Sequence, residues 1–201
     1  MWEHYQSLNQ FCERDEYQQW LAQWQPPEQW HVTQWVNSEQ QQWSMTPRQH
    51  GITAWSTRLA HWLLDTIDVA DHRTVDIGCG ENLFASAYVT VSGVDPRFSA
   101  DAELTDSWWQ HNEGIWPRAY ALNSLHFVTD ADQVNDQLQR VISTLDRQGR
   151  AVVTVNRSMI PNADQLWQLV PQWSGIDRAI WIDTPDNAPM DGNCWFWLKQ
   201  D

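Results

Sequence analysis

The sequence contains a single lysine, Lys199, and few basic residues of any kind. Twelve Lys and Arg side chains stand against 26 Asp and Glu side chains, so the formal net charge at pH 7 is −14. A chain with this charge repels nucleic-acid phosphates and anionic lipid surfaces, and its arginines are scattered along the sequence rather than clustered. We therefore expect neither nucleic acid nor a membrane as a binding partner.

Cysteines and long apolar runs are also scarce. Cys12, Cys79 and Cys194 lie far apart, and none belongs to a Cys-x-x-Cys pair, which argues against a zinc site or a disulfide framework. No run approaches the ~18 apolar residues of a membrane-spanning helix, and the first residues lack the basic start and apolar stretch of a secretory signal. These absences favour a soluble cytoplasmic protein with reduced thiols and no bound metal.

Tryptophan, in contrast, is abundant, with 16 in 201 residues. Most of them are expected to fill core and half-buried positions, where an indole buries a large apolar area. Residues 1–70 are rich in Gln and Trp and lack strand-like alternation, and their prolines divide them into expected helices at about 5–24, 28–42 and 53–66. We interpret residues 1–70 as a helical N-terminal cap, which could also bind a protein partner.

After Arg73 the pattern changes to short β-branched segments that alternate with helices. Strands are expected at 74–77, 91–94, 119–123 and 150–156, with helices at about 82–88 and 132–145. A helix at 163–170 and two strands at 178–182 and 194–199 follow, and the last two strands should be antiparallel because no helix joins them. Residues 71–201 are therefore expected to form one compact α/β domain, with a ligand crevice at the carboxyl ends of its parallel strands.

The residues with the clearest chemistry close the first two of these strands. The first strand contains Asp76 and leads into a loop with Gly78 and Gly80, where backbone can come close to a ligand. An acid two positions before the first glycine favours a cationic or amine-bearing ligand. Asp95 follows the second strand, 19 positions after Asp76, and can accept hydrogen bonds from both hydroxyls of a ribose.

The Asp-x-Gly-x-Gly sequence at 76–80, followed by an acid at the end of the second strand, resembles motif I and its successor in class I S-adenosylmethionine-dependent methyltransferases. Residues 121–127 resemble the fourth-strand region of the small-molecule, ubiquinone-biosynthesis-like type, and the resemblance covers about 74–156. It implies an α/β fold with a Rossmann-like sheet, mostly parallel with an antiparallel C-terminal hairpin. It also implies S-adenosylmethionine as the cofactor and methyl transfer to a small-molecule acceptor as the activity.

The resemblance assigns a role to each matching position of the cofactor site. Gly78 and Gly80 would approach the methionine part of the cofactor, and Asp76 would hold the loop and the amino group. Asp95 would bind the ribose, and the adenine contact would fall near 105–107, where we take Asp106.

The catalytic candidates are one residue at the end of the strand at 119–123, which corresponds to the family's fourth strand, and one shortly after it. Asn123 would contact the cofactor and face the transferred methyl group. His126 could act as a general base, since its ordinary pKa lies near neutrality, or it could cap the following helix. Trp108 and Trp109 could stack on adenine, although filling the core is the favoured interpretation.

Two other functions stay open on the sequence. The chain could be a non-catalytic, methyltransferase-fold interaction protein that binds a partner through its Trp- and Gln-rich cap. An NAD-binding oxidoreductase is less favoured, because Leu83 stands where a Gly-x-Gly-x-x-Gly loop requires glycine. No motif identifies the methyl acceptor.

Overall fold

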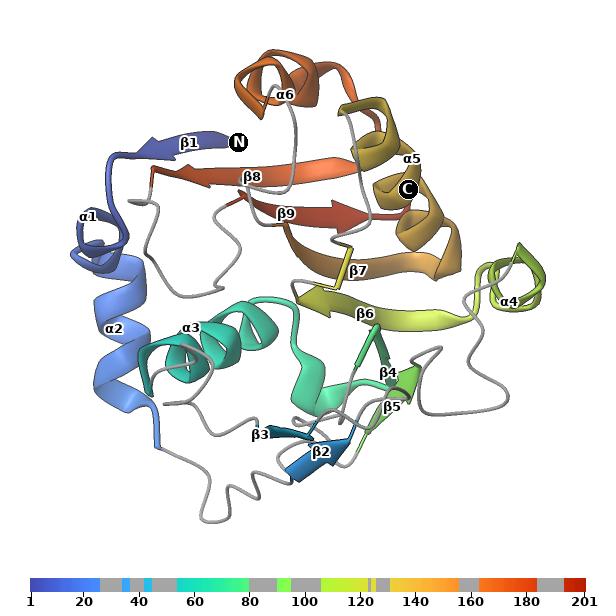
Figure 1. Ribbon diagram of the computed structural model, residues 1–201, viewed down its shortest axis with the longest axis horizontal. Coiled ribbons are helices and arrows are strands. Elements are labelled where there is room, and N and C mark those ends of the chain that lie inside the picture. The colour runs from blue at the N-terminus through green and yellow to red at the C-terminus, as the bar shows by residue number, and fades with distance from the viewer. Residues whose placement is uncertain are drawn as a thin grey trace.

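A seven-stranded sheet forms the centre of the computed structural model (Figure 1). The structure describes residues 1–25, 34–36, 42–44, 54–79, 90–94, 106–122, 124–125, 131–155, 163–183 and 194–201. The strands lie in the order β1 (Trp2–Tyr5), β8 (Ile176–Ile182), β9 (Cys194–Lys199), β7 (Leu145–Val155), β6 (Trp116–Leu122), β4 (Thr74–Ile77) and β5 (Val91–Val94).

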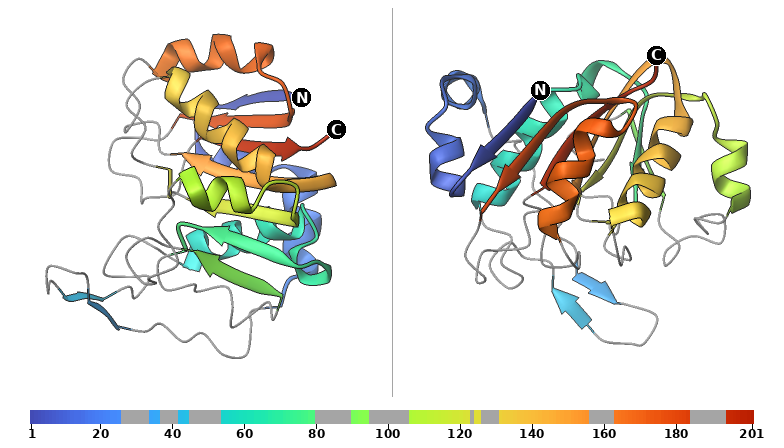
Figure 2. Two further views of the ribbon diagram at one scale, coloured as in Figure 1. Left: turned by 90° about the vertical axis from the view of Figure 1, so that its right-hand side faces the viewer. Right: turned by 90° about the horizontal axis from the view of Figure 1, so that it is seen from above.

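The strands of this sheet run in one direction except β9. Strand β4 pairs parallel with both β5 and β6, and β6 pairs parallel with β7. Strand β9 is antiparallel to β7 and to β8, and β1 is parallel to β8. The carboxyl ends of the parallel strands therefore share one edge of the sheet, to which their tips point in the left panel of Figure 2.

Helices cover both faces of the sheet, as the right panel of Figure 2 shows. One face carries α1 (Leu8–Cys12), α2 (Asp15–Gln23) and α3 (Ala54–Asp65), and the other carries α4 (Asp106–His111), α5 (Ala131–Thr144) and α6 (Ala163–Leu169). Short 3-10 turns follow α3 at Val69–Asp71 and α6 at Val170–Gln172. Among the described residues, no helix is both long and apolar enough to cross a membrane.

Alternation along the strands creates a separate core on each face. In β6, Ala119 and Ala121 belong to the core under α5, whereas Tyr120 between them belongs to the core under α3. On α5, Val134, Leu138 and other buried residues recur at helical spacing, so this helix lays one apolar stripe on the sheet. The result is a three-layer α/β/α arrangement.

Most of the elements predicted after residue 73 are confirmed. Strands β4, β5 and β9 have the predicted bounds, and α5, α6, β6 and β8 differ by one to three residues at an end. Strand β7 begins at Leu145 rather than at residue 150, and its ladder with β6 is irregular between Leu145 and Arg150, where Gln148 has a φ of 75°. The helix predicted at 82–88 lies outside the described residues.

The N-terminal part is only partly the helical cap that the sequence predicts. Trp2–Tyr5 forms an edge strand of the main sheet, and the helix predicted at 5–24 is divided into α1 and α2 by the extended backbone of Arg14. The helix predicted at 28–42 is wrong, because β2 (Gln34–Val36) and β3 (Gln42–Ser44) pair as a small antiparallel sheet. The helix α3 confirms the third prediction.

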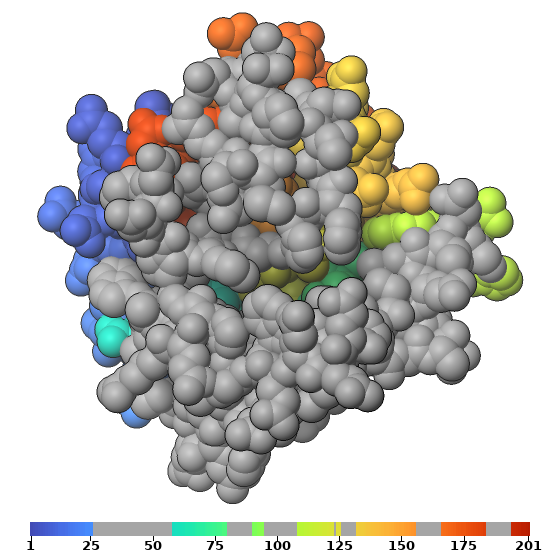
Figure 3. Space-filling model, viewed as in Figure 1, coloured from blue at the N-terminus to red at the C-terminus, as the bar shows by residue number. Residues whose placement is uncertain are grey.

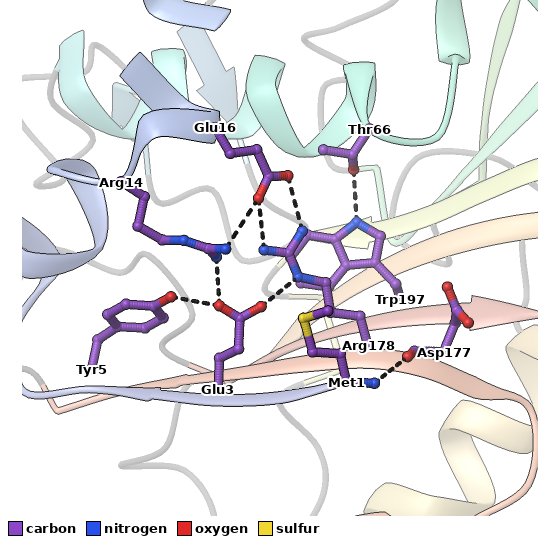
Figure 4. A network of polar contacts seen from close by, with 9 residues as sticks. All are labelled: Met1, Glu3, Tyr5, Arg14, Glu16, Thr66, Asp177, Arg178 and Trp197. Carbon is purple, nitrogen blue, oxygen red and sulfur yellow. Dashed lines mark hydrogen bonds and ion pairs between the residues drawn. The ribbon is translucent and has the colours of Figure 1, made fainter. Parts of the chain in front are cut away.

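A network of charges anchors this N-terminal part to β8 (Figure 4). The Nε of Arg178 donates a hydrogen bond to Glu3 at 2.9 Å, and its terminal nitrogens bind Glu16 on α2. A terminal guanidinium nitrogen of Arg14, Nη1, forms an ion pair with Oε2 of Glu3 at 2.6 Å. The guanidinium of Arg178 also lies over the ring of Trp197, 4.8 Å from its centroid.

Candidate functional site

The ends of β4, β5 and β6 meet at the carboxyl edge of the sheet. Asp76 pairs with Gly93 on one side and with Tyr120 on the other, so the three strands are in register shortly before they end. Strand β5, the next described strand in the chain, lies on one side of β4, and β6 lies on the other. This change of direction is a topological switch point, the place where open α/β sheets bind ligands. In the space-filling view, green and olive atoms of the sheet are visible in the middle of the face, between the blue N-terminal segment and the yellow α5 (Figure 3).

The glycine loop is bound directly to the end of β5. Gly78 has a φ of 73°, which favours glycine, and its N–H donates a hydrogen bond of 2.7 Å to the carbonyl of Val94. The N–H of Cys79 donates to the same carbonyl at 3.1 Å. Because Asp95 follows Val94 in the chain, this bend holds the start of the loop beside the segment that leads into Asp95.

The end of β6 lies on the other side of the loop. Ser124 donates a hydrogen bond from Oγ to the carbonyl of Ile77 at 2.6 Å. A Cβ atom added to Gly78 would lie 2.4 Å from the Cβ of Ser124, so only glycine fits at this position without displacement. Sequence reasoning did not single out Ser124, and its only signal was its place next to Asn123.

Asp76 is a buried carboxylate, with a relative exposure of 5%. Its neighbours Val75 and Ile77 belong to the core under α5, so alternation along the strand directs Asp76 to the face of Tyr120 and α3. A buried carboxylate is stable only with hydrogen bonds or a positive partner. Asp76 has an interaction within the folded chain, and its role of holding the loop and an amine stays a prediction.

Of the predicted site residues, Asp76 and Gly78 lie in the described part of the chain at the end of β4, and their roles toward a ligand stay predictions. Gly80, Asp95, Asn123 and His126 lie outside the described residues, and Asp106 is the first residue of α4. In the part of the chain that is described, no group of three or more His, Cys, Asp or Glu side chains is arranged to hold a metal ion.

The tryptophans of α4 belong to the core rather than to an open site. Trp109 is 7% exposed and lies in the core under α5, and Trp108 packs against the same core. The two indole rings meet edge to face with centroids 4.9 Å apart. The core-filling interpretation is therefore confirmed for Trp109.

Comparison with protein families and with curated protein sequences finds no match to this chain. Solved structures match at low identity. The YcgJ protein from Bacillus subtilis is 18% identical, with a TM-score of 0.33, and the match covers 48% of this chain and about half (49%) of that one. The antibiotic-resistance methyltransferase Kmr is 14% identical over 84% of this chain and 99% of its own, with a TM-score of 0.43. An S-adenosylmethionine-dependent methyltransferase from Thermotoga maritima, described as a possible histamine N-methyltransferase, is 13% identical over 75% of this chain and 98% of its own, with a TM-score of 0.36.

Proposed function

We propose that this chain binds S-adenosylmethionine at the carboxyl ends of β4, β5 and β6 and transfers its methyl group to a small-molecule acceptor. The observation that carries the proposal is the pair of hydrogen bonds from Gly78 and Cys79 to the carbonyl of Val94. Through these bonds the start of the Asp-x-Gly-x-Gly loop lies beside the end of β5, directly before Asp95. The two segments meet at a topological switch point of a mostly parallel sheet. These bonds support the resemblance to class I methyltransferases, and the sequence of residues 121–127 is the reason to propose the ubiquinone-biosynthesis-like type.

Two features of the described residues support this choice of cofactor. Gly78 turns the chain at a φ of 73° and has no side chain, so a ligand could approach the backbone of the loop closely. S-adenosylmethionine carries a positive sulfur and an amino group, and the buried carboxylate of Asp76 stands beside that loop. A dinucleotide, which is anionic, would gain less from a carboxylate in this position.

The cofactor, when bound, supplies a methyl group on a positively charged sulfur. In our proposal Gly78 and Gly80 admit the methionine part, and Asp76 holds the loop and the amino group. Asp95 accepts hydrogen bonds from the ribose hydroxyls, and Asp106 at the start of α4 contacts the adenine.

Catalysis in this scheme rests mainly on alignment of the acceptor with the methyl group. Asn123, which follows β6 in the chain, would face the methyl group. His126 takes the proton of the acceptor where the acceptor is protonated at the working pH.

The net charge of −14 supports a small-molecule acceptor over a nucleic acid or a membrane surface. The scarcity of basic residues would leave a polyanionic substrate without counter-charges. In the same proposal a protein partner would bind the N-terminal segment of residues 1–70, which carries much of the Gln and Trp.

Calorimetry tests the proposal by titrating S-adenosylmethionine, S-adenosylhomocysteine and NAD into the protein. We expect the first two to bind, and Asp95→Ala to weaken them about 10- to 150-fold, which corresponds to ~1.5–3 kcal/mol for hydrogen bonds to a charged group. Asp177→Ala is the control, because Asp177 is exposed near the amino end of β8. Binding of NAD alone would favour the oxidoreductase, and binding of none of the three would favour a non-catalytic interaction protein.

A further inference from the structure

The backbone pairing between β4 and β6 stops before β4 ends. Its last described pair joins Asp76 to Tyr120, whereas the pairing of β4 with β5 continues to Ile77 and Val94. Strands β4 and β6 therefore begin to separate at the switch point, on the side where a crevice opens in sheets of this kind. At Ile77 the connection is a side-chain hydrogen bond from a residue that follows β6.

That side chain is Ser124, which makes two separate contacts with the loop. Its hydroxyl donates to the carbonyl of Ile77 at 2.6 Å, a short and direct hydrogen bond. Its Cα lies 3.6 Å from the place where a Cβ of Gly78 would stand, and its own Cβ lies 2.4 Å from that place. The backbone of the glycine loop thus packs directly on residue 124.

The contact with Ser124 also fixes the position of the loop relative to the neighbouring strands. Gly78 is bound to Val94 on the opposite side, so the loop is held between β5 and residue 124. Asn123 immediately precedes Ser124, and consecutive Cα atoms are about 3.8 Å apart. The position of the loop relative to the residue assigned to the methyl group therefore depends on Ser124.

We propose that Ser124 is a positioning residue of the cofactor site, which sets the spacing between the glycine loop and the end of β6. The inference rests on the proposed function, because only a ligand that spans both segments would sense this spacing. Displacements of about 1 Å in such a site can lower rates on the order of 100-fold. In the proposed function the methionine part of the cofactor would contact both segments, whereas Asp95 would hold the ribose.

The experiment compares two ligands in wild type and in Ser124→Ala by calorimetry. S-adenosylhomocysteine carries the amino-acid part, and 5′-methylthioadenosine has the same nucleoside and sulfur without it. We expect Ser124→Ala to weaken S-adenosylhomocysteine about tenfold and 5′-methylthioadenosine less than about twofold, so that the ratio of the two dissociation constants changes at least fivefold. A purely structural role would weaken both ligands equally and leave that ratio unchanged, which would overturn the proposal.

Thr90→Val is the matched control. The hydroxyl of Thr90, directly before β5, also donates a hydrogen bond to a backbone carbonyl, that of Val69 in the 3-10 turn before β4, at 3.1 Å. This bond lies at the amino ends of β4 and β5, away from the proposed site. We expect both variants to lower Tm by a few degrees, roughly 2–4 °C, and only Ser124→Ala to change the ratio. If Ser124→Ala does not fold, Ser124→Cys keeps a weak donor and is expected to shift the ratio in the same direction, and an unchanged ratio overturns the proposal equally.

The failure of this inference and that of the proposed function give different results. If wild type does not bind S-adenosylhomocysteine, the proposed function is wrong. If wild type binds it and the Ser124 variants keep the wild-type ratio, the site stands and the positioning role is wrong.

Discussion

Arg178 donates hydrogen bonds from its two terminal nitrogens to the two carboxylate oxygens of Glu16, each at 3.0 Å. The residues are 162 positions apart, with Glu16 on α2 and Arg178 on β8 (Figure 4). The third guanidinium nitrogen binds Glu3 of β1 at 2.9 Å. A planar guanidinium can satisfy two carboxylates in this way, so one side chain attaches both a helix and an edge strand to the C-terminal part of the sheet.

We expect Arg178→Met to lower the free energy of unfolding by about 2 kcal/mol. Loss of one partner from a buried pair costs roughly 3–5 kcal/mol, and exposure of the Glu16 side chain (44%) reduces that figure through solvent screening. Arg178→Lys keeps the charge but loses the planar guanidinium that binds both carboxylates. We therefore expect a loss of unfolding free energy between those of wild type and Arg178→Met. Urea unfolding followed by tryptophan fluorescence measures both.

Arg73→Met serves as the control for the Arg178 variants. Arg73 also lies over an indole, 4.7 Å from the centroid of Trp116, but the structure records no carboxylate partner for it among the described residues. We expect its loss to cost less than about 1 kcal/mol. Arg73 also donates a hydrogen bond to the carbonyl of Ile115, so equal losses for the two Met variants would show that the carboxylates contribute no more than that bond.

His61 should make stability fall between about pH 6.5 and pH 4. Burial lowers its pKa to about 4, although the charge of Asp65 acts in the opposite direction. In the unfolded chain histidine binds a proton near pH 6.5, so the stability contribution is complete above that pH and decreases as the pH falls toward 4. The loss reaches up to about 3 kcal/mol, and urea unfolding at a series of pH values measures it.

Replacement of the histidine separates this effect from that of Glu16. His61→Phe keeps an aromatic ring near Trp24 and should flatten the profile between pH 6.5 and pH 4. Burial raises the pKa of Glu16, but the hydrogen bonds and charge of Arg178 and the charge of Arg14 lower it by more than burial raises it. The net result is a pKa below the ordinary value. The stability that Glu16 contributes is therefore fully present above its unfolded pKa of about 4.3. It is lost only as the pH falls through the lower pKa of the folded state. A His61→Phe profile that keeps the wild-type slope would contradict the assignment.

Gly78→Ala should destabilise the protein more than Gly114→Ala. Both glycines have positive φ angles, 73° and 64°, so each substitution costs about 1–2 kcal/mol of backbone strain. An added Cβ meets nothing within 4 Å at Gly114 but lies 2.4 Å from the Cβ of Ser124 at Gly78, which adds about 1–3 kcal/mol of overpacking. Thermal or urea unfolding compares the two.

A double variant identifies the atom responsible. Ser124→Gly removes the crowding Cβ and Oγ, so Gly78→Ala should cost less in that background than in wild type. Additive losses in this cycle would mean that the close approach does not determine the requirement for glycine.

We expect a thiol reagent to modify Cys79 before the other two cysteines. Cys12 and Cys194 are buried, whereas Cys79 is half-buried in the glycine loop. Burial and the charge of Glu13 also raise the pKa of Cys12 to about 12, which suppresses its reactive thiolate. Mass spectrometry after iodoacetamide treatment should find Cys79 labelled first in the native protein. Under the proposed function, S-adenosylhomocysteine should slow this labelling, and an unchanged rate with saturating ligand would count against the site.

The alternation after residue 73 predicted the parallel sheet because its segments are long or strongly patterned. Strand β7 contains an almost continuous β-branched run at 150–155, and α5 has an apolar stripe at helical spacing. The candidate site was partly predictable for the same reason: Asp76 and Gly78 stand at a strand end, where a parallel fold brings loops together.

The N-terminal elements were harder to predict. Strand β1 has four residues, too few for a period of two to be distinguished from the start of a helix, and its strand conformation depends on pairing with β8, more than 170 positions away. Strands β2 and β3 each have three residues and support one another only by pairing. Ser124 was missed because nothing in its own identity marks it, and its role follows from the carbonyl that it meets.

The sequence alone determined the periodic elements after residue 73, the place of the glycine bend and the acidic character of the chain, because periodicity, glycine and charge act locally or as sums over residues. Only the tertiary structure decided that Trp2–Tyr5 joins the sheet, that Val94 and Ser124 enclose Gly78, and that Arg178 joins Glu3 to Glu16. Each of these relationships pairs groups far apart in the chain, and such pairs come within hydrogen-bond range only when the whole sheet has formed.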